Sequence, residues 1–120
     1  MPSERARQAL YDIRDNILLA SGFAEGLSET AFRDDRKVFY AVVRALEIIS
    51  EASRQLPDAV KIRHGHLPWR QIAAAGNVYR HDYQNVTADF VWVTLHRSLP
   101  ALLLAVEAEL LRDGRPDETP

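Results

Sequence analysis

The segment from Gly76 to Tyr83 holds the residues of this chain whose types and spacing are best suited to chemistry. A histidine can exchange a proton near neutral pH, an arginine can bind a phosphate, and a tyrosine hydroxyl can act as acceptor or acid. In a metal-free site for phosphodiester chemistry, His81 would help to move the proton of an RNA 2′-hydroxyl, and an arginine would stabilise the charged transition state. The alternative is a structural turn in which His81 hydrogen-bonds to Asp82 or Tyr83.

A second pair of histidines, His64 and His66, flanks Gly65. This spacing is typical of a loop, and no carboxylate or cysteine stands nearby in the sequence to complete a coordination shell. The pattern favours a solvated loop over a zinc site. We therefore expect neither a metal nor another cofactor.

A line of charged side chains follows one predicted helix at steps of three, four and three residues: Arg44, Glu47, Glu51 and Arg54. The simplest interpretation is a ladder of solvated salt bridges, worth about 0.3 kcal/mol per pair. However, Glu47 and Glu51 are like charges four residues apart, so they gain little from each other. The alternative is that one of them orients Arg80 or His81 across the bundle, and the sequence does not say which.

The length of 120 residues predicts one domain, which we place at 1–113, followed by a frayed acidic tail at 114–120. The chain has no cysteine, which excludes disulfides and thiol catalysis and is typical of a reducing compartment. The longest unbroken apolar run is Ala101–Val106, far below the roughly 20 residues that cross a bilayer. We therefore expect a cytoplasmic protein without membrane contact.

Basic side chains gather between Ala59 and His81, where the sequence has no Asp or Glu. A local basic zone on an acidic body suits a small anionic ligand or a short stretch of RNA. The alternative is that these side chains point to different faces and form no patch. The zone contains Lys61, Arg63, Arg70, Arg80 and three of the four histidines.

Three long amphipathic helices are predicted from apolar residues at alternating steps of three and four: Ser3 to Phe23, Asp34 to Leu56 and Thr87 to Arg112. Ser3 is a candidate N-cap, Gly22 a candidate helix end, and Pro100 is expected to kink the third helix near His96. Shorter helices are expected at Ser28–Arg33, Pro57–Arg63 and from Pro68 toward Tyr83. The pattern predicts an all-α, up-and-down bundle of four or five helices.

Several apolar residues lie off the main stripes of the second and third helices: Phe39, Val43, Leu46, Val91 and Leu103. One bundle seam cannot cover two apolar faces. We therefore expect a second covering surface, most simply that of a two-fold symmetric homodimer.

Several blocks of this sequence match those of a known protein family. The chain resembles the HepT-like toxins of the HEPN superfamily (domain of unknown function 86), which are encoded beside a minimal nucleotidyltransferase antitoxin. The resemblance spans five blocks in order: Asp12–Ile17, Arg44–Ser53, Leu67–Trp69, Gly76–Gln84 and Trp92–Leu102. It implies a helical dimer.

The resemblance also implies a function. In this family an Arg, four residues, His, any residue, Tyr motif forms a metal-independent RNase centre near the dimer cleft, and the nucleotidyltransferase silences it by transferring AMP to the motif tyrosine. His81 matches the motif histidine, Tyr83 the AMP acceptor and Asn77 the asparagine that often follows the motif arginine.

One position departs from the motif, because Gly76 stands where the arginine is expected. The nearest arginine, Arg80, lies one step before His81, about 100° from it around a helix. Arg80 could act from the other subunit of a dimer. Two hypotheses follow: an RNase subunit, or a catalytically weak helical dimer that serves as binding partner and AMPylation substrate of the nucleotidyltransferase.

Overall fold

The computed structural model describes residues 3–81 and 86–113, and the side chains of Arg80 and His81 lie outside the described part. Every regular element in these ranges is a helix, which confirms the predicted all-α class. The elements are α1 (Glu4–Ala24), α2 (Glu29–Asp34), α3 (Arg36–Ser53), α4 (Asp58–Arg63), α5 (Trp69–His81), α6 (Ala88–Val93), the π-helical turn η2 (Thr94–Ser98) and α7 (Leu99–Asp113).

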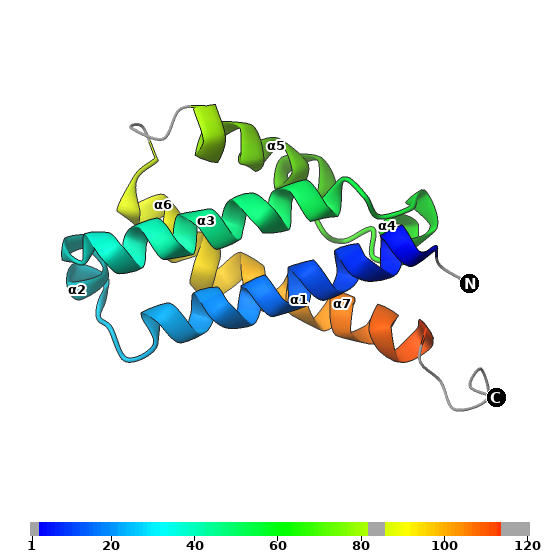
Figure 1. Cartoon of the computed structure of the whole chain (residues 1–120), viewed down its shortest axis with the longest axis horizontal. Helices are drawn as coiled ribbons and strands as arrows, with labels where there is room; N and C mark the ends of the chain where they lie inside the picture. Colours follow the sequence, from blue (N-terminus) through cyan, green and yellow to red (C-terminus); the bar gives the residue numbers. More distant parts are fainter. Residues whose placement is uncertain (1–2, 82–85, 114–120) are drawn as a thin grey trace.

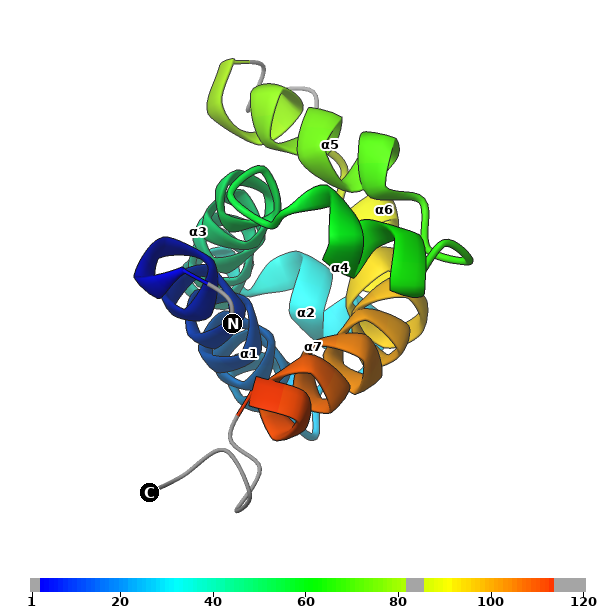
Figure 2. The same cartoon turned by 90° about the vertical axis from the view of Figure 1, so that its right-hand side faces the viewer.

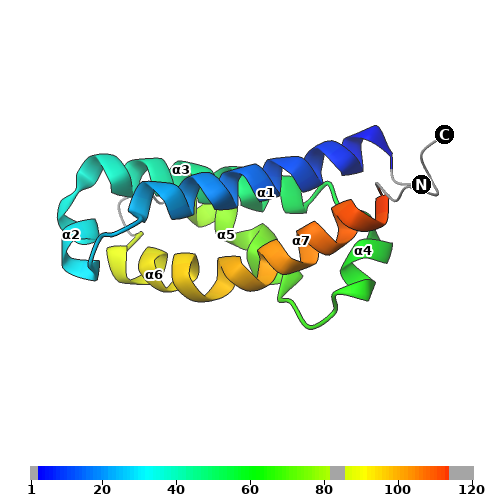
Figure 3. The same cartoon turned by 90° about the horizontal axis from the view of Figure 1, so that it is seen from below.

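The long helices run alternately up and down around one core (Figure 1). Helix α3 packs between α1 and α5, and α7 packs on the other side of α1. Seen end-on, α1, α3 and α7 surround the core while α5 lies on the outer side of α3 (Figure 2). From below, α6 and α7 form one rod that runs beside α1 (Figure 3). The predicted up-and-down bundle is therefore confirmed.

Side-chain caps start the first three helices. The hydroxyl of Ser3 accepts a hydrogen bond from the Ala6 N–H at 3.0 Å, as predicted, and that of Ser28 caps α2 in the same way. Asp35 caps α3 through the N–H of Val38. Each cap satisfies an N–H that has no partner inside its helix.

Two predicted helix ends were wrong. Helix α1 continues past Gly22 to Ala24, and the chain turns at Gly26, whose φ of 81° is the left-handed conformation that glycine adopts without strain. Helix α3 ends at Ser53 rather than Leu56. The residue before a proline is disfavoured in the helical conformation, so Pro57 disfavours a helical Leu56.

The predicted disturbance near His96 takes the form of a π-helical turn. Proline has no N–H, and its ring clashes with the carbonyl four residues earlier, which here is that of His96. The turn η2 spans Thr94–Ser98, and α7 follows it without a break, with Pro100 as its second residue. The apolar stripe of the rod stays buried across this turn, at Val91, Leu95 and Leu99.

The residues that predicted a second covering surface are covered within the chain itself. Val43, Leu46 and Val91 are buried, and Phe39 and Leu103 pack partly buried against the same core. The fold therefore removes this argument for a homodimer, which stays a prediction on the strength of the family resemblance.

One continuous helical stretch, Ala88–Asp113, is long and apolar enough to cross a bilayer by length and composition, a feature that the search for unbroken apolar runs missed. Core helices of soluble proteins pass the same test. The apolar stripe of this stretch is buried in the bundle: Val91, Leu95, Leu99, Leu102 and Val106. A single stretch of this kind is weak evidence of a membrane span.

Candidate functional site

Helix α3 positions the candidate site by bonding directly to the backbone of α5. The hydroxyl of Ser50 accepts from the Gly76 N–H at 2.8 Å and lies 2.6 Å from the carbonyl oxygen of Ile72, to which it donates. Those two backbone groups are four residues apart, so the hydroxyl inserts into the hydrogen-bond ladder of α5. Ser50 is 2% exposed, and this buried link determines how closely α5 approaches α3.

Gly76 has no room for a side chain at this crossing. A Cβ built on Gly76 would lie 2.6 Å from the Ser50 Oγ and 2.9 Å from its Cβ. Both distances are shorter than van der Waals contact, so any larger residue requires α5 to move away from α3. The glycine that departs from the family motif is thus required by the packing of these two helices.

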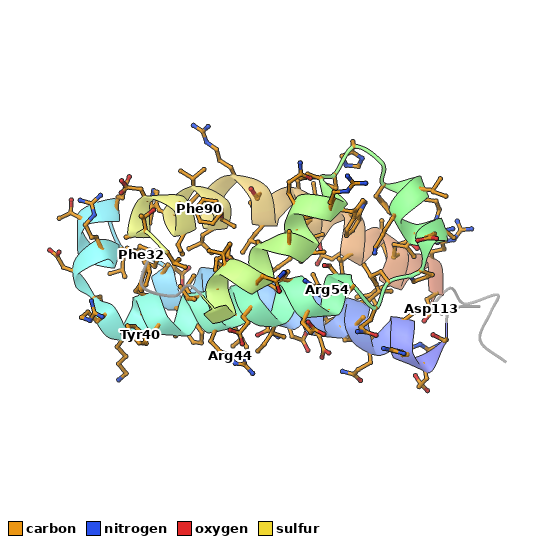
Figure 4. The ribbon with its side chains drawn as sticks, turned by 90° about the horizontal axis from the view of Figure 1, so that it is seen from above. Phe32, Tyr40, Arg44, Arg54, Phe90 and Asp113 are labelled. Carbon is orange, nitrogen blue, oxygen red and sulfur yellow. The ribbon has the colours of Figure 1, made fainter. Side chains whose placement is uncertain are left out.

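A second residue of α3, Arg54, reaches the same part of α5. Its Nη2 donates to the carbonyl of Ala73 at 3.0 Å and lies 3.5 Å from Oδ1 of Asn77. Figure 4 shows Arg54 where α5 crosses the end of α3. The sequence pattern placed Arg54 in a ladder with Glu51, and its contact with α5 was missed because nothing local indicates which helix lies beside it.

The last turn of α5 carries the two predicted catalytic residues. Arg80 and His81 are both in helical conformation, and their side chains lie outside the described residues. Asp82 and Tyr83 also lie outside the described residues. The structure thus places the backbone of Asn77, Arg80 and His81 on one helix, as predicted.

The other tyrosine of the segment, Tyr79, belongs to the core. It is 3% exposed, and burial raises its pKa to about 12, while a hydrogen bond with Thr94 acts in the opposite direction. Its ring lies 6.3 Å from that of Phe90. Tyr79 also lines an apolar cavity of about 280 Å³ between α3, α5 and the α6–α7 rod. A hydroxyl buried in this way is closed to a macromolecular modifying enzyme.

The predicted supporting carboxylates line a groove of their own between α3 and α1. Glu47 pairs with Arg44, and both line a polar groove together with Glu51 and with Asp12 of α1. Figure 4 shows Arg44 extending away from the bundle. The predicted pairing is present between Arg44 and Glu47, although the Glu47 side chain is half-buried, and a role of Glu47 or Glu51 at the site stays a prediction.

The histidine loop was misjudged, because a carboxylate does lie beside it. Glu109 of α7, 6% exposed, accepts two hydrogen bonds from Arg63, at 3.0 and 2.7 Å. The same carboxylate lies 2.8 Å from Nε2 of His64. The hydrogen bond from Arg63 lowers the pKa of Glu109, burial opposes this, and His64 lowers it further. This cluster fastens α4 to α7 and could not be seen from residues so distant in sequence.

The same cluster divides the predicted basic zone. Arg63 and His64 are engaged by Glu109, whereas Arg70 is exposed on α5. Two members of the described part of the zone are therefore already paired with a carboxylate. Within the described ranges, no group of three histidine and acidic side chains is arranged to hold a metal ion.

The comparisons with known proteins give the family of this chain. The family described as Ribonuclease HepT-like matches residues 13–109. This chain therefore belongs to the HepT-like ribonuclease family.

Individual relatives of the chain are named as ribonucleases. The chain is 37% identical over 93 residues to a probable ribonuclease HepT of Thermococcus cleftensis, covering 78% of this chain and 84% of that protein. It is 33% identical to a putative RNase of Caldanaerobacter subterraneus, covering 74% and 80%. A putative RNase of Methanocaldococcus jannaschii is 28% identical, with 94% and 93% covered. No solved structure matches the chain.

Proposed function

We propose that this protein is a metal-independent endoribonuclease and the toxin of a two-component module, neutralised when a minimal nucleotidyltransferase transfers AMP to Tyr83. Membership of the HepT-like ribonuclease family supports an RNA substrate. The observation that carries the proposal is the position of Arg80 and His81 in the last turn of α5. The proposed setting is the cytoplasm.

The proposed chemistry needs only a proton-transfer group and a cation. His81 takes the proton of an RNA 2′-hydroxyl, and that oxygen attacks the adjacent phosphorus to form a 2′,3′-cyclic phosphate while the bond to the 5′-oxygen of the next nucleotide breaks. The departing 5′-oxygen takes up a proton, returned by His81 or supplied by water, and leaves as a hydroxyl. Arg80 stabilises the additional negative charge on the phosphate oxygens. Neither step requires a metal, so cleavage is expected to persist in EDTA.

The test is cleavage of cellular RNA by the purified protein in EDTA. We expect His81→Ala to lower the rate by a factor of at least about 100, the contribution of a positioned acid or base. His66→Ala is the matched control, because His66 is exposed in the loop before α5. An unchanged rate in His81→Ala would remove His81 from the mechanism.

A homodimer forms part of this proposal. His81 follows Asn77 by four residues on α5, so the two positions share one side of that helix, and Asn77 is exposed. A second copy facing this side would close the site. Analytical ultracentrifugation over a range of concentrations tests the dimer, and a monomer at high concentration contradicts it.

Mixing two inactive variants tests whether the subunits share residues. If Arg80 of one subunit serves His81 of the other, a heterodimer of Arg80→Ala and His81→Ala contains one intact pair, and mixing restores part of the activity. If both groups act within one subunit, the mixture stays inactive.

A second function is favoured by the contact between Ser50 and Gly76, which leaves no space for an arginine side chain at the motif position. In this alternative the protein is a catalytically weak dimer that binds the nucleotidyltransferase and receives AMP without cutting RNA. We expect Tyr83→Phe to abolish AMP incorporation by that enzyme while the complex still forms. Tyr79→Phe is the control, since the buried hydroxyl of Tyr79 is not an acceptor in either case.

A further inference from the structure

We propose that Arg54 of α3 is a phosphate-binding residue of the α5 site. The inference rests on the proposed RNA function and adds to it a residue outside the motif segment. Arg54 lies 23 residues before Asn77 in sequence but contacts it in the fold. The ligand is the ribose-phosphate backbone of a single-stranded RNA.

The guanidinium of Arg54 is held in place through its Nη2 nitrogen. Its two hydrogen bonds to described residues come from Nη2, one to the carbonyl of Ala73 and one to the side chain of Asn77. Because guanidinium is planar and rigid, fixing one nitrogen against a helix limits the directions in which the others point. The two acceptors are separated by one helical turn of α5, so the contact orients Arg54 along that helix.

The remaining hydrogen-bond donors of this guanidinium are available to a ligand. An arginine has five N–H donors, of which two belong to Nη2. Among the described residues, Nε and Nη1 have no hydrogen-bond partner, and Arg54 is exposed. A side chain that is anchored at Nη2 and open at Nε and Nη1 can donate a charge-assisted hydrogen bond to a phosphate oxygen.

The location of this charge also fits the site. Asn77 is four residues before His81, so Arg54 contacts the turn of α5 that directly precedes the proposed proton-transfer residue. Gly76 of the same turn cannot carry a side chain without displacing Ser50. The neighbouring helix is therefore a source of positive charge over this turn that the packing of α3 and α5 permits.

The experiment measures binding of the full-length protein to a short fluorescein-labelled 2′-O-methyl RNA, which cannot be cleaved through its 2′-oxygen. We expect Arg54→Gln to weaken binding about tenfold, the effect of one charge-assisted hydrogen bond. The slope of log K against log salt concentration should fall by about 0.7, the value for one phosphate contact on a single strand. Arg54→Lys should keep the slope and recover part of the affinity.

Arg5→Gln is the matched control, because Arg5 is exposed on α1 and its loss changes the net charge equally. Equal effects of Arg5→Gln and Arg54→Gln on the slope would overturn the proposal, since net charge alone would explain them. Thermal unfolding of each variant separates lost binding from lost folding.

Cleavage assays distinguish this proposal from the proposed function. If the wild-type protein cleaves RNA and Arg54→Gln binds and cleaves equally well, Arg54 is not a phosphate ligand and the RNase function stands. If the wild-type protein neither binds nor cleaves RNA, both are wrong. A higher KM in Arg54→Gln, with a smaller change in kcat, supports the assignment.

Discussion

The hydroxyl of Ser50 lies 2.8 Å from the backbone nitrogen of Gly76, and this contact determines how closely α3 and α5 approach. Both residues are buried, and Ser50 also donates to the carbonyl of Ile72. A small hydroxyl on one helix and a residue without a Cβ on the other are both needed for this geometry. The pair therefore links the stability of the bundle to the position of the motif helix.

The first prediction concerns Gly76→Ala. The added Cβ would meet Ser50 at 2.6 and 2.9 Å, so we expect a loss of about 1–3 kcal/mol in the free energy of unfolding, as for other overpacked sites. Gly22→Ala is the control, because nothing lies within 4 Å of its Cβ and alanine favours the helix. There we expect a gain of about 0.5 kcal/mol. Urea unfolding measures both.

The source of the loss can be tested with a double-mutant cycle. Ser50→Gly removes both atoms that the new Cβ would meet, so Gly76→Ala should cost much less in that background than in the wild type. Additive effects would show that the cost does not arise from contact with Ser50.

The second prediction concerns Glu109, whose side chain bonds to Arg63 and His64. Replacing Glu109 by Ala leaves both partners without their acceptor, and we expect a loss of about 1–3 kcal/mol. The lower part of this range applies if water reaches Arg63, which is 37% exposed. Glu107→Ala on the exposed side of the same helix is the control and should stay within about 0.5 kcal/mol. Thermal unfolding compares the two variants.

The third prediction is a pH dependence with its origin in the same cluster. Arg63 holds the pKa of Glu109 below its ordinary value of 4.5, so in acid the unfolded chain binds this proton before the folded one. The stabilisation is complete above pH 4.5 and is lost as the pH falls through the folded pKa. Denaturant unfolding in acid should therefore show a weaker pH dependence for Glu109→Gln than for the wild type. Equal pH dependence would contradict the assignment.

The helices could be predicted from sequence because their signals are local. Ser3 and Ser28 cap the helices that follow them, and the apolar periodicity identified the long helices. The glycine signal was ambiguous, since Gly22 is helical while Gly26 makes the turn. Only the backbone conformation distinguishes the two.

The contacts that define the site are not local, and the sequence could not reveal them. Glu109 meets His64 across 45 residues and Arg54 meets Asn77 across 23. Gly76 was recognised as a departure from the motif, but its cause became visible only when Ser50 was placed against it. His81 could be singled out from sequence because its segment matches a family motif, whereas the side chains that surround that segment depend on how the helices pack.

The last prediction concerns the buried hydroxyl of Tyr79. Burial raises its pKa from 10.0 to about 12, so in alkali the unfolded chain loses this proton before the folded one. The stabilisation is complete below pH 10 and declines as the pH rises toward 12. Tyr79→Phe removes this decline, and because the ring is kept it should change the free energy of unfolding at neutral pH by no more than about 1 kcal/mol. Urea unfolding at neutral and alkaline pH measures both effects, with Tyr11→Phe on the exposed side of α1 as control. A wild-type decline that persists unchanged in Tyr79→Phe would assign the alkaline sensitivity to another group.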